Sequence, residues 1–192
     1  MKINNAGLQL IKDFEGCKLS CYHLGDGVCT VGYGTTRPLS LCRGAGSWKI
    51  SKAEAERLLL SNLASYEKAV SGYFARPLNE NQFSALVSFA YNLGGGIFKK
   101  YNWSKAEPDK QITGRMIQYV NPEQFRAGLT RRRKAEIALF DTPVSADRFY
   151  TVKQGDTLSG IGQKVKIPWQ EIASKNGIKS PYTIYPNQKL KL

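Results

Sequence analysis

The spacing of apolar residues predicts helices over most of the first 141 residues. Apolar side chains recur at helical spacing from Ile3 to Phe14, and Gly16 follows them, so a short helix is expected to end near Glu15. From residue 19 to residue 36 the apolar runs become short and glycines interrupt them. This second pattern is typical of a small antiparallel sheet with tight turns.

Two longer helices with clear start signals are expected next. Ser51 with Glu54, and Asn79 with Gln82, each match the capping-box pattern at the head of an apolar run of helical period. Further helices are expected before residue 141. The last of them contains the segment TRRRKAEIALF, in which we expect Thr130 to be the cap and the arginines to face solvent or substrate.

The pattern changes after residue 141. The stretch DTPVSADR is short, polar and contains proline, which predicts a linker over residues 142–148. Residues 149–192 follow the order strand, helix, helix, strand. The predicted fold class is therefore α+β, with a mainly helical domain and its small antiparallel sheet over residues 1–141 and a small βααβ domain over residues 149–192.

The net charge and the N-terminal sequence indicate which partners and which compartment to expect. The net charge of +13 attracts polyanions, which include nucleic acid, anionic lipid and acidic wall polymers. The basic run from Arg131 to Lys134 is a weak nucleic-acid signal because no recognisable reading element accompanies it. The first residues lack a continuous apolar signal segment, so we expect synthesis in the cytoplasm without a signal peptide.

The four cysteines fall within one short stretch of the sheet region. They are Cys17, Cys21, Cys29 and Cys42. Disulfides suit an oxidising site of action, and the sequence leaves the three pairings open, together with free thiols. A four-thiolate zinc site would normally show paired CxxC spacing, so no metal and no cofactor are expected.

Glu15 is the first candidate for chemistry. Cleavage of a glycosidic bond needs a carboxylic acid that protonates the leaving oxygen. Glu15 lies where the first helix meets the sheet, beside Phe14. Taken alone, a glutamate at such a position is more often an ordinary surface residue.

The residues around Glu15 resemble a known signature. The stretch FEGCKLSCYHLGDGVCTVGYGTT is similar to that of the phage lysozyme family, glycoside hydrolase family 24, and QFSALVSFAYNLGGGIF and GLTRRRKAEIALF resemble its core and closing helices. The resemblance covers about residues 1–141. It implies a lysozyme-type N-acetylmuramidase in which Glu15 is the general acid and Thr30 helps to place the attacking water.

The sequence departs from the family at two positions. Leu24 stands where the family usually has an aspartate, and Asp26 is the nearby carboxylate that could replace it or could simply favour its Gly-Asp-Gly turn. Thr35 replaces the usual histidine, which leaves His23 as the sole imidazole. Three outcomes stay open: hydrolysis, a lytic transglycosylase that gives anhydro products, and a catalytically impaired wall-binding protein.

Two residues of the first domain are expected to bind substrate. Tyr33 offers an aromatic ring on which a sugar can stack, and Asn92 offers an amide for its hydroxyls.

Residues 149–192 are similar to LysM modules, which bind glycans that contain N-acetylglucosamine. The segments YTVKQGDTLSGI and IYPNQKLKL carry this resemblance. It implies a shallow groove formed by two loops, and Asp156 and Thr157 are also expected to cap a helix. The groove residues would be Gly155, Asp156, Thr157, Leu158, Ile178, Pro181, Tyr182 and Ile184.

The two resemblances together imply an endolysin that the LysM module targets to the bacterial cell wall. Its expected partner is peptidoglycan, with anionic outer-membrane lipid or wall polymer as additional partners and no specific nucleic acid. The protein is expected to be a monomer that acts on the wall, in the periplasm or outside the cell, after its release from the host cytoplasm.

Overall fold

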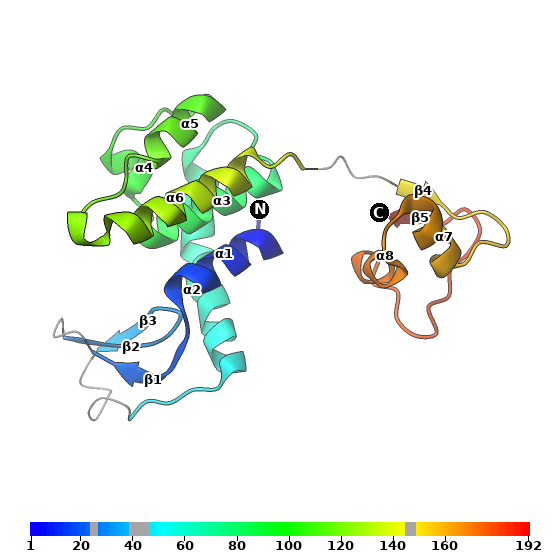
Figure 1. Cartoon of the computed structure of the whole chain (residues 1–192), viewed down its shortest axis with the longest axis horizontal. Coiled ribbons are helices and arrows are strands. Elements are labelled where there is room, and N and C mark those ends of the chain that lie inside the picture. Colours follow the sequence, from blue (N-terminus) through cyan, green and yellow to red (C-terminus); the bar gives the residue numbers. More distant parts are fainter. Residues whose placement is uncertain (24–26, 39–46, 145–148) are drawn as a thin grey trace. The chain divides into compact units, whose positions relative to one another are not determined.

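The computed structural model describes residues 1–23, 27–38, 47–144 and 149–192 (Figure 1). It separates into two compact units, Met1–Val144 and Ser145–Leu192. None of the described helices combines the length and the hydropathy of a membrane-spanning segment. The α+β class expected from the sequence is confirmed in both units.

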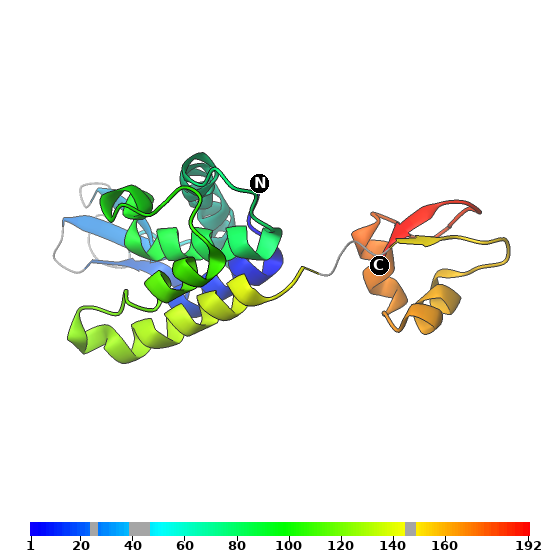
Figure 2. The ribbon, with the colours of Figure 1, turned by 90° about the horizontal axis from the view of Figure 1, so that it is seen from above.

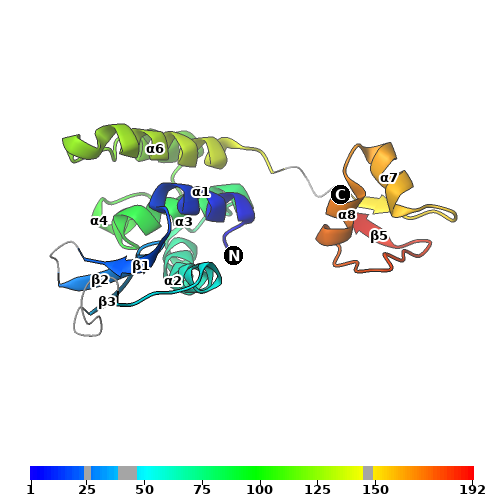
Figure 3. The same cartoon turned by 60° about the horizontal axis from the view of Figure 1, so that its bottom comes forward.

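The first unit is a group of helices with a small sheet at one end. Helix α3 (Glu80–Leu93) packs against α1 (Asn5–Glu15), α2 (Lys52–Tyr73) and α6 (Arg126–Asp141). Figures 1 and 3 show α1 between α6 and the sheet. The remaining helical segments are α4 (Ile97–Lys100), α5 (Asp109–Met116) and the short 3₁₀ helix Glu123–Phe125.

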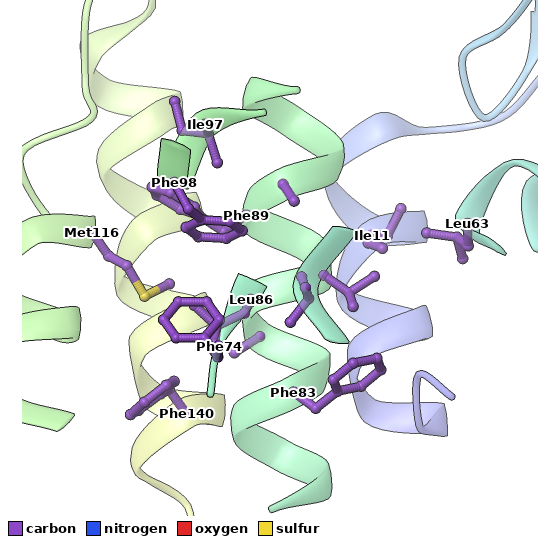
Figure 4. Packing of buried hydrophobic residues seen from close by; sticks show 14 of the residues in the cluster. Ile11, Leu63, Phe74, Phe83, Leu86, Phe89, Ile97, Phe98, Met116 and Phe140 are labelled. Atoms are coloured by element: carbon purple, nitrogen blue, oxygen red, sulfur yellow. The ribbon is translucent and has the colours of Figure 1, made fainter. Parts of the chain in front are cut away.

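Aromatic and aliphatic side chains from all sides of α3 form one core (Figure 4). Phe83, Leu86 and Phe89 of α3 are almost completely buried, and Ile11, Leu63 and Phe140 cover them from the neighbouring helices. Burial of one such side chain contributes roughly 1.5–3 kcal/mol, so this core fixes the mutual positions of the helices. The helices in turn fix the side chains that they carry toward the surface.

The start and end signals of the helices explain their bounds. Asn4 caps α1 by accepting a hydrogen bond from the backbone N–H of Gly7, and Gly16 ends the helix with a φ of +66°. Asn79 and Gln82 form the predicted capping box of α3 in full. Ser51 caps α2 as predicted, but the Glu54 carboxylate binds Arg57 at 2.6 and 2.8 Å.

Helix α6 departs from the sequence-based prediction. It begins at Arg126, directly after the 3₁₀ turn, so Thr130 lies inside the helix and the prediction that it caps the helix was wrong. Arg131 and Lys134 are exposed as expected. Arg132 and Arg133 are instead buried, because carboxylate, carbonyl and amide oxygens from α1, α3 and α6 itself receive their hydrogen bonds.

The sheet consists of three antiparallel strands in the order β1 (Lys18–Tyr22), β2 (Val28–Gly32) and β3 (Thr35–Pro38). Figure 2 shows it at the end of the unit that lies opposite the chain's N-terminus. Cys29 and Val31 of β2 are buried on one face of the sheet, against Trp48 and Ile50. Since side chains alternate along a strand, Thr30 points to the other face.

The cysteines of this region differ in state. Cys29 is disulfide-bonded, and Cys17 carries a free thiol. The sulfur of Cys21 accepts a hydrogen bond from the backbone N–H of Trp48 at 3.3 Å. Cys42 lies outside the described residues.

The second unit has the expected strand-helix-helix-strand order. Strands β4 (Phe149–Thr151) and β5 (Lys189–Lys191) pair in antiparallel fashion, and α7 (Leu158–Val165) and α8 (Trp169–Lys175) lie between them in the chain. One small core holds the unit together. It contains Val152, Leu158, Ile161, Ile172, Ala173 and Leu190.

Candidate active site

Glu15 is the last residue of α1, and its side chain keeps 24% of its surface exposed. Its Oε1 atom accepts a hydrogen bond from Arg132 Nη1 at 2.7 Å. Its Oε2 atom lies beside Gly34, where a Cβ atom would stand 4.0 Å away. The positive φ of +94° at Gly34 favours glycine at the position.

Glu15 lies where two cavities adjoin. One cavity, of about 620 Å³, extends toward the sheet and α2, and the other, of about 600 Å³, extends toward the start of α6. Glu15 and Asn92 line both of them. A long polymer that occupied both cavities would therefore pass the Glu15 carboxyl near the middle of its bound length.

The cavity on the sheet side is lined almost entirely by polar side chains. Besides Glu15, Gly34 and Asn92, its lining consists of Thr36, Arg37, Ser61, Asn62, Ser65, Tyr66 and Tyr91. Hydroxyl, amide and guanidinium groups at this density suit a ligand with many hydroxyl groups. The other cavity is more apolar, since Phe14, Leu93, Pro122, Phe125 and Leu129 form part of its wall.

Hydrogen bonds hold two of the cavity residues in place. The Tyr91 hydroxyl donates to the carbonyl oxygen of Tyr33 at 2.7 Å, and burial raises the pKa of Tyr91, which keeps the hydroxyl protonated as a donor. The Asn62 amide donates to Thr35 Oγ1 at 2.9 Å, and Thr35 is itself buried. Thr35, which stands where the resembled signature has histidine, thus positions a side chain of the cleft wall.

The residues expected at the site from the sequence do not all meet there. Asn92 lines both cavities, whereas the Tyr33 side chain is 2% exposed and faces Lys52, so the Tyr33 ring is not available for stacking in the cleft. Thr30 pairs with Thr36 across the sheet and shares its face. Because Thr36 lines the cavity, Thr30 lies on the cavity side of the sheet.

The structure does not describe all of the candidate residues. Leu24 and Asp26 lie outside the described residues. His23 is exposed and directly follows β1. Within the part of the chain that the structure describes, no group of three His, Cys, Asp or Glu side chains could hold a metal ion.

The second unit arranges its candidate residues around two turns. Asp156 accepts hydrogen bonds from Lys153 N–H, Tyr150 Oη and Lys164 Nζ, each at 2.8 Å. These donors, with Lys164 contributing most, lower the pKa of Asp156 to about 2. Thr157 caps α7 as expected, whereas Asp156 fixes the preceding turn.

The other turn of the second unit presents an aromatic residue. Tyr182 is 44% exposed, adopts a φ of +58° and packs edge-on against Trp169 at 5.0 Å. Among the remaining candidates, Gly155 and Pro181 are exposed, Leu158 belongs to the core, and Ile178 and Ile184 pack against it.

Two known protein families match this chain. Residues 12–136 match the family model "Phage lysozyme". The chain belongs to the phage lysozyme family. Residues 150–192 match the LysM domain model.

Three similar proteins illustrate the relationship. The endolysin of Bacillus phage B103 is 29% identical over 99% of this chain and 78% of its own length. The solved muramidase domain of SpmX from Asticaccaulis excentricus is 33% identical with a TM-score of 0.62, over 74% of this chain and 99% of that one. The N-acetylmuramoyl-L-alanine amidase sle1 of Staphylococcus saprophyticus is 58% identical over 22% of this chain and 13% of its own length.

Sequence reasoning missed two side chains of the cleft. Arg132 was assigned to a face toward solvent or substrate, and Asn62 was not singled out at all. One signal was present for the arginine: Arg132 and Arg133 stand four and three residues before Glu136, the spacing at which side chains on a helix meet. An ion pair at that spacing on a helix that packs against the core is compatible with burial.

Proposed function

We propose that this chain is an endolysin that hydrolyses the β-1,4 bond between N-acetylmuramic acid and N-acetylglucosamine in bacterial peptidoglycan. The observation that carries the proposal is the position of Glu15, a partly sheltered carboxyl where two cavities adjoin. A general acid must reach the bridging oxygen of a bound polymer, and this position meets that requirement.

The reaction needs one proton donor and one activated water. Glu15 protonates the leaving sugar oxygen as its bond to the anomeric carbon breaks. Arg132 contacts Oε1, so the proton can reside on Oε2, which faces Gly34. Thr30, on the cavity side of the sheet, helps to orient the water that attacks the anomeric carbon from the opposite side.

We further propose Asp26 as the base that takes the proton from this water. An inverting glycosidase separates its two carboxyl groups by about 6.5–9.5 Å to leave room for the water. Asp26 is the carboxylate closest in sequence to Leu24, where the resemblance places an aspartate.

Two other functions compete because of Leu24. Without a base, the substrate's own hydroxyl can attack the anomeric carbon and give the anhydro product of a lytic transglycosylase. A unit with no activity would be a wall-binding protein. Mass analysis of soluble fragments from purified peptidoglycan separates the three: we expect reducing muramic ends, whereas anhydro ends would indicate transglycosylation, and intact peptidoglycan would indicate a binder.

The second unit is proposed to bind glycans that contain N-acetylglucosamine, with Tyr182 and the Gly155 turn exposed for contact. Two weak binding modules on one chain raise each other's effective concentration on a polymer. We expect deletion of residues 142–192 to slow cleavage of whole walls and to spare short soluble fragments. Equal losses on both substrates would contradict the tethering role.

The charge and the site of action complete the proposal. The net charge of +13 adds attraction to anionic wall polymer or outer-membrane lipid rather than to a specific nucleic acid. The protein is proposed to act as a monomer on the cell wall, after release from the cytoplasm in which it is made.

A further inference from the structure

Helix α6 buries a cluster of three charged side chains behind the cleft. Glu136 and Arg133 are completely buried, and Arg132 is 4% exposed. Burial raises the pKa of Glu136 and lowers the pKa of Arg133 to about 10, so desolvation acts against the charged form of both groups. Buried ion pairs stabilise a fold little compared with apolar side chains of similar size, so stability alone does not explain this cluster.

Glu136 receives hydrogen bonds from both arginines and from α3. Its Oε1 atom accepts from Ser88 Oγ at 2.7 Å, from Arg132 Nε at 3.2 Å and from Arg133 Nη2 at 3.4 Å. Its Oε2 atom lies 3.0 Å from Arg133 Nε. The Ser88 bond fixes the carboxylate, and the carboxylate fixes the two guanidinium groups.

Both guanidinium groups reach the cleft with their other ends. Arg132 Nη1 donates to Glu15 Oε1 at 2.7 Å, and Arg133 Nη2 donates to Asn92 Oδ1 at 2.8 Å. A guanidinium is planar and rigid, so a contact at Nε sets the direction of the terminal nitrogens. The ring of Phe89 lies 4.7 Å from the Arg133 guanidinium carbon and supports it from one side.

We propose that Glu136 is a positioning residue that holds Glu15 through Arg132 and Asn92 through Arg133. The proposal rests on the proposed function, because it assigns to Glu136 the geometry of the general acid and of a substrate-binding amide. These two side chains line both cavities. One buried carboxylate thereby sets the distance between the proton donor and a residue that contacts the same bound polymer.

The test compares Glu136→Gln with Glu107→Gln in the full chain. Glu107 is a matched control, since it is 2% exposed and binds one arginine, Arg115, at 2.8 Å, but lines neither cavity at Glu15. With soluble peptidoglycan fragments we expect Glu136→Gln to lower kcat by about ten- to a hundredfold, because displacement by about 1 Å can have such an effect. KM should rise less than kcat falls, and Glu107→Gln should retain the wild-type kcat.

Arginine Nε–H signals in NMR spectra provide a readout that is independent of activity. Glu136→Gln should lose the slowly exchanging signal of Arg132, whose Nε–H donates to Glu136, and should keep that of Arg115, and Glu107→Gln should do the reverse. Wild-type kcat in folded Glu136→Gln, or retention of the Arg132 signal, would overturn the proposal. If the wild type itself cleaves no peptidoglycan, the proposed function fails, and the Arg132 signal still decides whether Glu136 holds this arginine.

A third variant covers the case in which Glu136→Gln does not fold. Ser88→Ala keeps every charge and removes the 2.7 Å hydrogen bond to Glu136. We expect it to fold and to lower kcat by roughly two- to fivefold, less than the full contribution of one hydrogen bond to a charged group, because both arginines still hold the carboxylate. An unchanged kcat in Ser88→Ala would then contradict the role of Glu136.

Discussion

Replacement of Arg132 by methionine removes the guanidinium that joins α1, α3 and α6. Arg132 Nη1 binds Glu15 at 2.7 Å, Nε binds Glu136 at 3.2 Å, and Nη2 donates to the Ser88 carbonyl at 3.4 Å. Methionine fills most of the volume of the aliphatic stem but satisfies none of these acceptors. The substitution therefore leaves the carboxylates of Glu15 and Glu136 without this hydrogen-bond donor.

The two carboxylates differ in what they lose. The Glu15 side chain is 24% exposed and can regain water, whereas Glu136 is completely buried and keeps only Arg133 and Ser88. Breaking a buried ion pair from one side typically costs about 3–5 kcal/mol. Because Glu15 can rehydrate, we expect a loss near the lower limit, about 3 kcal/mol in the free energy of unfolding.

Differential scanning calorimetry of the full chain measures this loss. For a unit of this size, about 3 kcal/mol corresponds to a decrease in Tm of roughly 6–12 °C. The transition of the second unit serves as an internal reference. Arg57→Met is the control, since its pair with Glu54 lies on the surface, where solvent screens it, and its loss should leave Tm nearly unchanged. Equal Tm values for wild type and Arg132→Met would refute the reasoning.

Three further predictions concern single positions. Gly34→Ala should destabilise the first unit by about 1–3 kcal/mol because of the positive φ at this position, and it should also slow peptidoglycan cleavage. Gly96→Ala is the control: its φ is negative and a Cβ there would meet open space, so both Tm and the cleavage rate should stay close to wild type. Gly7→Ala should lower the Tm of the first unit, because a Cβ there would lie 2.6 Å from Ser84 Cβ; an unchanged Tm would show that α1 and α3 are less tightly packed. The ionised carboxylate of Asp156 stabilises the second unit above pH 3.8, because its pKa is lowered in the folded state, and this contribution should disappear as the pH falls through about 2. Asp156→Asn lacks this contribution at every pH. Acid unfolding followed by circular dichroism should therefore be less steep in Asp156→Asn than in the wild type.

Local signals in the sequence predicted the elements whose ends are set by neighbouring residues. The capping box of Asn79 and Gln82 and the stop at Gly16 both involve residues within four positions of each other, and the structure has both. Helix α6 was harder to predict. Its start depends on the preceding 3₁₀ turn, so Thr130, a good cap by type, lies inside the helix.

Sequence motifs predicted only part of the candidate site. Glu15 and Asn92 were identified from the sequence, and both line the cleft. The burial of Arg132 and Arg133 depends on oxygens that α1 and α3 supply from positions 41 to 117 residues away, and no local pattern contains that information. Tyr33 illustrates the opposite error. Its ring suited sugar stacking, but the residue lies in the turn directly after β2, and its side chain is buried there.

The central claim is that the carboxyl of Glu15 donates the proton that breaks the glycosidic bond. Its most direct test is the rate at which wild type, Glu15→Gln and Asp13→Asn release reducing ends from purified peptidoglycan. Asp13 is an exposed carboxylate on the same helix, so its loss controls for the change in charge. The account predicts a loss of about a hundred- to ten-thousandfold for Glu15→Gln and a near wild-type rate for Asp13→Asn. A Glu15→Gln protein that releases reducing ends as fast as the wild type would contradict it.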